Sequence, residues 1–369
     1  MTRMPGLDLA RAIAILWVMV FHSRGVGLLP QNPVSNYGWM GVDLFFVLSG
    51  FLICGQLLQA VGQGERPLMA GFYARRAFRI LPVYALVAGL YLMVPPLREL
   101  PAIQPAWQFA TFTENLFFDE SVGKAFSHVW SLCVEEHFYL AAPLIAALAV
   151  WPRARRFGWP LLAVLVVGGV ALRAGLWLRL PHEGAATGHY VPGYLREIYY
   201  PTWCRLDGLL AGAALAAVRV FHPQAWAAVL QRPWLCLTFA AGGMALSFWL
   251  FRARFSLEAT TLGFPVLAAS LAALVAGLAS PRLGMRHPAW GAAGFVAAIS
   301  YSLYLCHKAI FHLVQTFSGL HGGPLTVAAW IAALAAGTML YLGVERPFLR
   351  LRGRVLGGRT GAVMAGAAA

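Results

Sequence analysis

Charged residues are scarce in this sequence. Asp, Glu, Lys and Arg make up 11% of its 369 residues, whereas a soluble domain carries about a quarter of its residues as charged. Hydrophobic residues make up 60% of the chain. This composition excludes an ordinary soluble globular protein and predicts an integral membrane protein whose apolar surface faces lipid.

Cysteine is also scarce, and several motifs of well-known chemistries are missing. The five cysteines are scattered and show neither a disulfide framework nor metal-ligand spacing. The sequence contains no Walker-type Gly-rich loop, no H-E-x-x-H and no G-x-S-x-G. These absences argue against a P-loop nucleotide site, a zincin protease and an α/β-hydrolase, and we expect no bound metal.

Acidic residues are half as numerous as basic ones, 14 against 28, which gives a net charge of +14. In a membrane protein such an excess of Lys and Arg anchors cytoplasmic loops, so we expect no nucleic-acid partner. With the N-terminus placed inside, the inner segments hold 17 basic residues and the outer segments seven. The charge pattern therefore predicts that both termini face the cytoplasm.

Apolar runs near the length needed to cross a bilayer occur ten times, at residues 12–29, 38–58, 78–94, 131–151, 159–178, 201–220, 234–251, 259–279, 295–317 and 325–344. The fourth run is the weakest, because its clean apolar part begins at Phe138 and contains Pro143. Segment 101–118 is too polar and Pro-rich to span, which favours an interfacial or re-entrant piece. We predict an all-α integral membrane protein with about ten transmembrane helices in a single bundle over residues 1–354, followed by a short disordered cytoplasmic tail over 355–369.

The stretch "RAIAILWVMVFH" carries an arginine and a histidine at the ends of an apolar segment, at Arg11 and His22. On an α-helix, eleven residues bring His22 back to within roughly 20° of the face that carries Arg11, about 16 Å further along the axis. The two side chains therefore lie on one stripe at two depths of the membrane.

Ionisable residues recur at a similar outer depth in other predicted spans: Asp43, Glu135, Glu136, His137, Arg205, Asp207, His307 and Lys308. Such residues are costly in a membrane and suggest a functional site. Structural alternatives stay open, because Lys308 can snorkel and His307 can be a hydrogen-bonded packing residue. His22 shares a stripe with Arg11 and a depth with Asp43, and a neutral imidazole near a carboxylate is suited to general-base catalysis.

A second group of charges lies at the inner end, where "FYARRAFRILP" contains Arg75, Arg76 and Arg79. These arginines are either topology anchors or a phosphate-binding group. A donor with a phosphorylated head and a long flexible arm would connect them with an outer base. Acyl-coenzyme A fits that description.

Several stretches together resemble the membrane-bound acyltransferase type 3 family, which includes O-antigen, exopolysaccharide and macrolide acyltransferases. They are the spacing of Arg11 and His22, "GVDLFFVLSGFLI", "FYARRAFRILP", "WSLCVEEHFYL", "TWCRLDGLLAG", "ISYSLYLCH" and "VERPF". The resemblance covers nearly the whole chain. It implies about ten helices in a bacterial cytoplasmic membrane and transfer from cytoplasmic acyl-CoA, usually acetyl-CoA, to a hydroxyl of an extracytoplasmic glycan or similar acceptor.

Carried over residue by residue, the resemblance implies that Arg11 and His22 are an essential pair and that Arg76 and Arg79 form an essential basic motif. It also implies that Glu136 is the acidic residue of the motif in the stretch "WSLCVEEHFYL". On this interpretation His22, assisted by Asp43 or Glu136, is the catalytic base, and Arg11 holds or orients the donor. The segments 101–118 and 181–200 are our candidates for acceptor choice.

Two other functions remain compatible with the sequence. A multi-pass transporter or flippase of a lipid-linked or small substrate would use the same charges as a pathway, although the two halves show no matching broken segments. A purely structural membrane subunit is a more distant alternative, because it needs no set of ionisable residues at one depth.

Overall fold

The computed structural model describes residues 4–63, 69–122, 125–148, 156–181, 189–284 and 290–365. Six of the basic residues used to predict orientation lie outside these ranges: Arg3, Arg66, Lys124, Arg153, Arg155 and Arg286. Residues 182–188 of the candidate acceptor segment also lie outside them.

The first half of the chain is built from helices joined by irregular segments. Its elements are α1 (Pro5–Gly25), α2 (Pro33–Asn36), α3 (Met40–Gly62), α4 (Met69–Met93), η1 (Pro95–Leu97), α5 (Ala106–Ala110), η2 (Ser127–Val129), α6 (Trp130–Leu148) and α8 (Gly158–Trp177). Apart from helices, the described residues form one isolated bridge between Ile103 and Ala125.

The second half is also helical and contains three short π-helical segments, η4, η7 and η9. Its elements are η4 (Leu195–Tyr199), η5 (Thr202–Cys204), α9 (Asp207–Phe221), α10 (Pro223–Gln231), α11 (Pro233–Leu250), η6 (Phe251–Ala253), η7 (Ala259–Gly263), α12 (Phe264–Leu278), η8 (Pro281–Leu283), α13 (Trp290–Phe317), α14 (Gly322–Leu340), η9 (Tyr341–Glu345) and α15 (Arg346–Ala365). Helix α15 thus includes most of the segment that the sequence predicts as a tail.

The all-α membrane bundle predicted from the sequence is confirmed, but the count of ten helices is not. Within the described residues, eight helices are long and apolar enough to cross a membrane. A ninth is added if α9 and α10, which meet at a bend of 110°, form one broken span. The weak fourth run corresponds to α6, which is outside this set and carries charged residues in its first turns.

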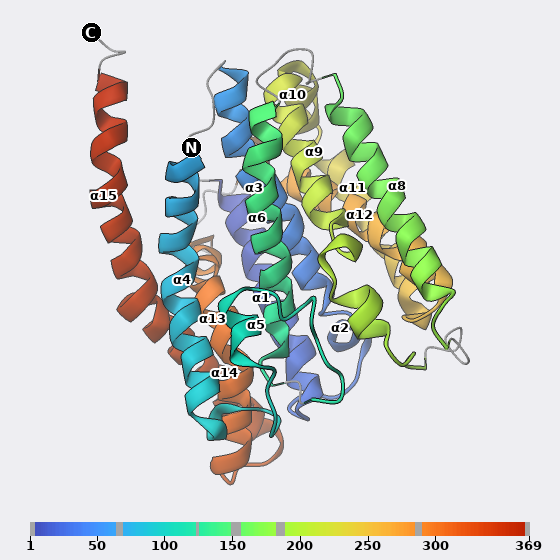
Figure 1. Cartoon of the computed structure of the whole chain (residues 1–369), viewed down its shortest axis with the longest axis vertical. Coiled ribbons are helices and arrows are strands. Elements are labelled where there is room, and N and C mark those ends of the chain that lie inside the picture. The colour runs from blue at the N-terminus through green and yellow to red at the C-terminus, as the bar shows by residue number, and fades with distance from the viewer. Residues whose placement is uncertain are drawn as a thin grey trace.

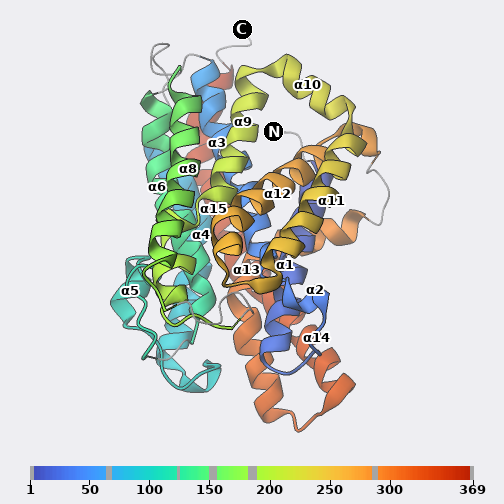
Figure 2. The ribbon, with the colours of Figure 1, turned by 90° about the vertical axis from the view of Figure 1, so that its right-hand side faces the viewer.

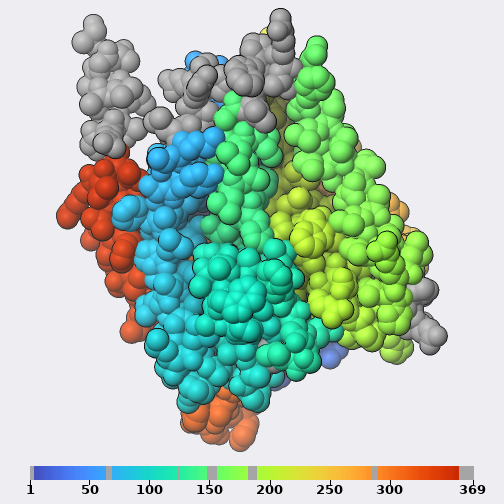
Figure 3. All heavy atoms as spheres, in the orientation of Figure 1, coloured from blue at the N-terminus to red at the C-terminus, as the bar shows by residue number. Residues whose placement is uncertain are grey.

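Helix α3 is the centre of the bundle. It packs against α1, α6, α9 and α12, while α13 packs against α1 and α14. In the ribbon views α10 lies at the upper end, whereas α2 and α5 lie in the lower half (Figures 1 and 2). The space-filling view shows residues 95–122 covering the lower part of one face (Figure 3). The connections therefore gather at two opposite ends of the bundle.

Helices α3 and α9 make a close contact through two glycines. A Cβ atom on Gly50 would meet the backbone oxygen of Leu209, and a Cβ atom on Gly212 would meet the backbone oxygen of Val47. Without a hydrophobic driving force between helices in lipid, such close backbone packing is a main source of association. It brings the N-terminal end of α9 next to the first turns of α3.

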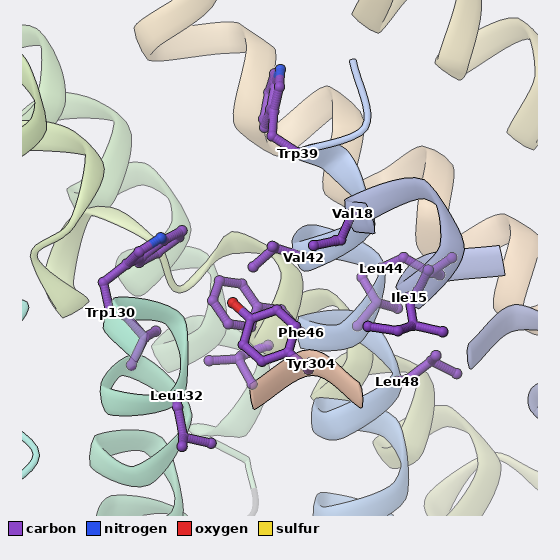
Figure 4. Close-up of a cluster of buried hydrophobic side chains, with 14 of the residues drawn as sticks. Ile15, Val18, Trp39, Val42, Leu44, Phe46, Leu48, Trp130, Leu132 and Tyr304 are labelled. Carbon is purple, nitrogen blue, oxygen red and sulfur yellow. The ribbon is translucent and has the colours of Figure 1, made fainter. Parts of the chain in front are cut away.

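Apolar side chains from four helices fill the middle of the molecule. Figure 4 shows Ile15 of α1, Phe46 of α3, Leu132 of α6 and Tyr304 of α13 in one cluster, and these residues are buried. Tyr304 is the member with a hydroxyl group, and its contacts connect this cluster to the polar groups of the candidate site.

Candidate functional site

Three histidines from distant parts of the chain meet in one cluster: His22 on α1, His128 on η2 and His307 on α13. Their ring centroids are 5.0 Å apart for His22 and His307, 5.3 Å for His128 and His307, and 6.0 Å for His22 and His128. Nδ1 of His22 lies 2.7 Å from Nε2 of His307. His128 and His307 are buried, whereas His22 is half-buried as a residue, which makes it the most exposed of the three residues.

The histidine cluster lies beside an ion pair that the sequence does not predict. Nζ of Lys308 is 2.6 Å from Oε1 of Glu99, and the backbone N–H of Phe126 donates to the same oxygen. Burial disfavours the ionised form of Glu99, but the Lys308 ammonium and backbone hydrogen bonds together lower the pKa of this loop carboxyl below its usual value. The charge of Lys308 is therefore compensated at the site itself.

Hydroxyl groups connect the histidines to the centre of the bundle. The Tyr304 hydroxyl donates to the backbone oxygen of His128 at 2.7 Å, and the Ser131 hydroxyl lies 2.6 Å from the Tyr304 hydroxyl. Both side chains are buried. This pair also forms part of the wall of a cavity on the inner side of the cluster.

The cavity has a volume of about 200 Å³ and is bounded by α1, α3, α4, α6 and α13. Its apolar part includes Phe45 and Phe46, and its polar lining consists of Arg11, Ser49, Gln56, Arg76, Arg79, Ser131, Glu135, Tyr139, Ser300, Tyr301 and Tyr304. One cavity therefore extends from predicted basic residues to the Ser131–Tyr304 pair that contacts His128.

Arginines dominate one part of this cavity. Arg11, Arg76 and Arg79 line it, and Arg352 of α15 is close enough to repel Arg76 and Arg79 electrostatically. We call these four residues the cationic cluster. The guanidinium of Arg76 stacks on the ring of Tyr139 at 5.2 Å and forms no ion pair within the described ranges.

The other two cavity arginines have acidic neighbours. Arg11 lies 3.9 Å from Asp8, and Arg79 lies 3.5 Å from the buried carboxylate of Glu345. The π-helical segment η9 ends at Glu345, and the Ser302 hydroxyl donates to it at 2.7 Å. Arg11 and Arg79 keep 33% and 30% of their side-chain surface exposed, so the basic end of the cavity is accessible. Arg75 is exposed and is not part of the cavity lining.

The paired glutamates of α6 face different surroundings. Glu135 lines the main cavity and accepts hydrogen bonds from Ser49 at 2.8 Å and Tyr139 at 3.1 Å. Glu136 lines a neighbouring cavity of about 100 Å³ together with Arg76. The structure thus places the predicted acidic residue Glu136 near the cationic cluster, and it shows no contact between Glu136 and His22.

Asp43 lies in a buried charge network on the other side of α3. Its Oδ1 is 2.8 Å from Nη2 of Arg205, and the Arg205 guanidinium is stacked among aromatic rings, including Phe264 at 4.1 Å. Nearby, Arg173 and Asp207 form a second buried ion pair at 2.7 Å. These contacts join α3 to the residues between η5 and α9, and α8 to α9. The structure records no contact between Asp43 and His22.

The candidate acceptor segment 101–118 contains a buried carboxyl group, Glu114. One of its oxygens has no hydrogen-bond partner in the part of the chain that the structure describes. Burial raises the pKa of Glu114 to about 8, although the Lys308 ammonium opposes this change. Burial therefore favours the neutral form of Glu114 at pH 7.

Sequence reasoning missed His128, Glu99 and Glu114. All three lie in the connection between α4 and α6, where no helical periodicity relates a residue to its neighbours in space. The unusual mixture of aromatic and polar residues in 101–118 is the sequence feature that points to this connection. Across the described residues, no group of three or more His, Cys, Asp or Glu side chains is placed to hold a metal ion.

Comparison with known proteins adds an independent finding. A family model described as "Acyltransferase domain" matches residues 4–344. The chain is 28% identical over 233 residues to the peptidoglycan O-acetyltransferase OatA of Listeria monocytogenes, a match that covers 59% of this chain and 34% of the relative. It is 26% identical over 228 residues to the O-acetyltransferase OatA of Staphylococcus aureus, with 58% and 34% covered. The chain thus spans about a third of the length of these relatives, and no solved structure matches it.

Proposed function

The chain belongs to the acyltransferase family whose domain model matches nearly all of it, and we propose that it moves an acyl group from cytoplasmic acyl-CoA to a hydroxyl of an extracytoplasmic glycan. Acetyl is the proposed group, since the relatives are named O-acetyltransferases. One of them is named for peptidoglycan, which makes peptidoglycan the first acceptor to test. The proposed location is the bacterial cytoplasmic membrane with both termini inside.

One observation carries this proposal: the cavity that joins the cationic cluster to the Ser131–Tyr304 pair beside the histidines. Arginines bind phosphates through paired, charge-assisted hydrogen bonds. The phosphates of acyl-CoA would occupy the accessible end, where Arg76 forms no ion pair within the described ranges. The thioester arm would extend along the cavity toward Tyr304.

His22 would act on the acceptor at the other end. Its ring removes the proton of the acceptor hydroxyl as the oxygen attacks the thioester carbonyl carbon. The carbon–sulfur bond then breaks, and the departing thiolate of coenzyme A takes the proton from His22. The products are the acyl ester and coenzyme A with a free thiol, so protons and electrons balance.

The proposal is tested with membranes that contain wild-type protein or His22→Ala at matched levels. Labelled acetyl-CoA and peptidoglycan are supplied, and label is counted in the glycan fraction. We expect transfer by the wild type and a loss of roughly 10²–10⁴-fold in His22→Ala, the size of a general-base contribution.

His312→Ala is the matched control, because His312 lies on α13 and contacts Thr316 rather than the cluster. It should transfer label as the wild type does. Equal labelling by His22→Ala and wild type would contradict the role of His22. Movement of a lipid-linked glycan across the membrane without coenzyme A would instead favour the alternative function of a transporter or flippase.

A further inference from the structure

The hydrogen bonds of His307 determine where its proton lies. Nδ1 of His307 is 3.0 Å from the backbone oxygen of Leu303, four residues earlier on α13. A carbonyl oxygen can only accept, so Nδ1 of His307 must carry a hydrogen. In a neutral imidazole the other nitrogen then has no hydrogen and accepts. Nε2 of His307 is therefore an acceptor in the neutral ring.

The acceptor at His307 fixes the tautomer of His22 in turn. Nε2 of His307 lies 2.7 Å from Nδ1 of His22, so Nδ1 of His22 must be the donor. A neutral His22 that donates through Nδ1 has a free lone pair on Nε2. This nitrogen is on the far side of the ring from His307 and is the one atom of His22 left to act as a base.

The surroundings of His307 favour its neutral form. The side chain is 0% exposed, and it forms no ion pair with a carboxylate in the described ranges; the nearby Glu99 is paired with Lys308 at 2.6 Å. Burying an unpaired charge is costly. A cationic His307 would also reverse the hydrogen bond and leave the proton of His22 on Nε2, which would remove the base.

Among the side chains that the structure describes around His22, no other group is placed to fix its tautomer. The ring of His128 contacts the backbone oxygen of Leu305 at 3.3 Å, and its centroid is 6.0 Å from that of His22. Asp43 is bound to Arg205. The contact with His307 is the side-chain hydrogen bond that the structure records for His22.

We infer that His307 is a positioning residue that holds His22 in the tautomer with hydrogen on Nδ1, so that Nε2 takes the proton of the acceptor hydroxyl. This inference rests on the proposed function. The acceptor proton moves to Nε2 of His22 during attack and from there to the thiolate of coenzyme A, while the Nδ1 hydrogen stays in the bond to His307. The hydrogen bonds from the Leu303 carbonyl through His307 to His22 thus fix the tautomer of His22, as a carboxylate does beside other catalytic histidines.

Two substitutions of His307 separate this role from packing. His307→Leu fills the space but cannot accept a hydrogen bond, whereas the amide of His307→Gln can donate to the Leu303 carbonyl and accept from His22. We expect kcat for acyl transfer to fall about 10²-fold or more in His307→Leu with KM for acetyl-CoA unchanged. We expect His307→Gln to recover most of the loss.

The control is His312→Ala, on the same helix, which should keep the wild-type kcat and KM. His307→Leu within threefold of wild type would overturn the inference, and so would equal losses in His307→Leu and His307→Gln. If His307→Leu does not accumulate, the test rests on His307→Gln. A kcat of His307→Gln a hundredfold below that of the wild type, with KM unchanged, would contradict the inference. Failure of the proposed function is distinguishable, because the wild type would then transfer no label.

Discussion

At the scale of single residues, the proposed function assigns donor binding and proton transfer to different chemical types of side chain. Arginines surround one part of the cavity, and histidines lie beyond the Ser131–Tyr304 pair. Arg76 is the cavity arginine without an ion pair in the described structure; its guanidinium is stacked on Tyr139. A guanidinium that forms no ion pair keeps its N–H donors available for an anion, and the donor phosphates would supply that anion.

Arg76→Ala should therefore weaken acyl-CoA binding about ten- to a hundredfold, the range expected for a hydrogen bond to a charged group. The measurement is equilibrium binding of labelled acetyl-CoA to the purified protein. Arg350→Ala is the matched control, because Arg350 is exposed on α15 near the same end of the molecule. An unchanged affinity in Arg76→Ala would return this residue to the role of a topology anchor.

The sequence predicted some residues of the site and none of their pairings. Helical geometry can relate Arg11 to His22, because both lie on one continuous helix, α1. The contact between His22 and His307 joins residues 285 positions apart, and no spacing rule describes such a contact. The same limit explains why Asp43 was placed beside His22 by depth alone, although depth does not say which side of α3 a residue faces.

At the scale of elements, two buried ion pairs connect the helices around α9. Arg173 of α8 contacts both carboxylate oxygens of Asp207, at 2.7 and 3.0 Å, and also donates to backbone oxygens of Cys204 and Thr260. Arg173 is 1% exposed. One side chain thus connects α8, η5, η7 and α9.

Arg173→Met should lower the free energy of unfolding by about 3–5 kcal/mol, because it leaves the Asp207 carboxylate buried without its partner. The measurement is unfolding of the purified protein in detergent micelles. Arg179→Met, an exposed arginine just beyond the end of α8, should change stability by less than about 0.5 kcal/mol. Adding Asp207→Asn to Arg173→Met should restore part of the loss, and a fully stable Arg173→Met would contradict the account.

Most of the predicted spans correspond to helices, because a run of about 20 apolar residues has few other options in lipid. The observed helices differ from the predicted spans at features that amino-acid composition does not reveal. The bend of 110° between α9 and α10 follows His222, which precedes Pro223 at the first position of α10. The π-helical segments η4, η7 and η9 leave no distinct hydrophobic pattern, yet η9 delivers Glu345 to Arg79.

At the scale of the whole molecule, the arrangement separates a basic end from a histidine end of one bundle. The helix α10 and the segment 95–122 mark opposite ends in Figure 1. The positive-inside pattern predicts that the α10 end faces the cytoplasm. If the donor enters at the basic end and the acceptor meets His22 at the other, the acyl group crosses the membrane while the donor and acceptor stay on their own sides.

The most direct test of this account uses proteoliposomes in which the protein has one known orientation. Labelled acetyl-CoA is enclosed on the side of the N-terminus, and peptidoglycan fragments are added on the opposite side. The account predicts that label appears in the glycan on the opposite side with wild-type protein and is nearly absent with His22→Ala. Label that appears only when donor and acceptor share one side would contradict transfer through the bundle.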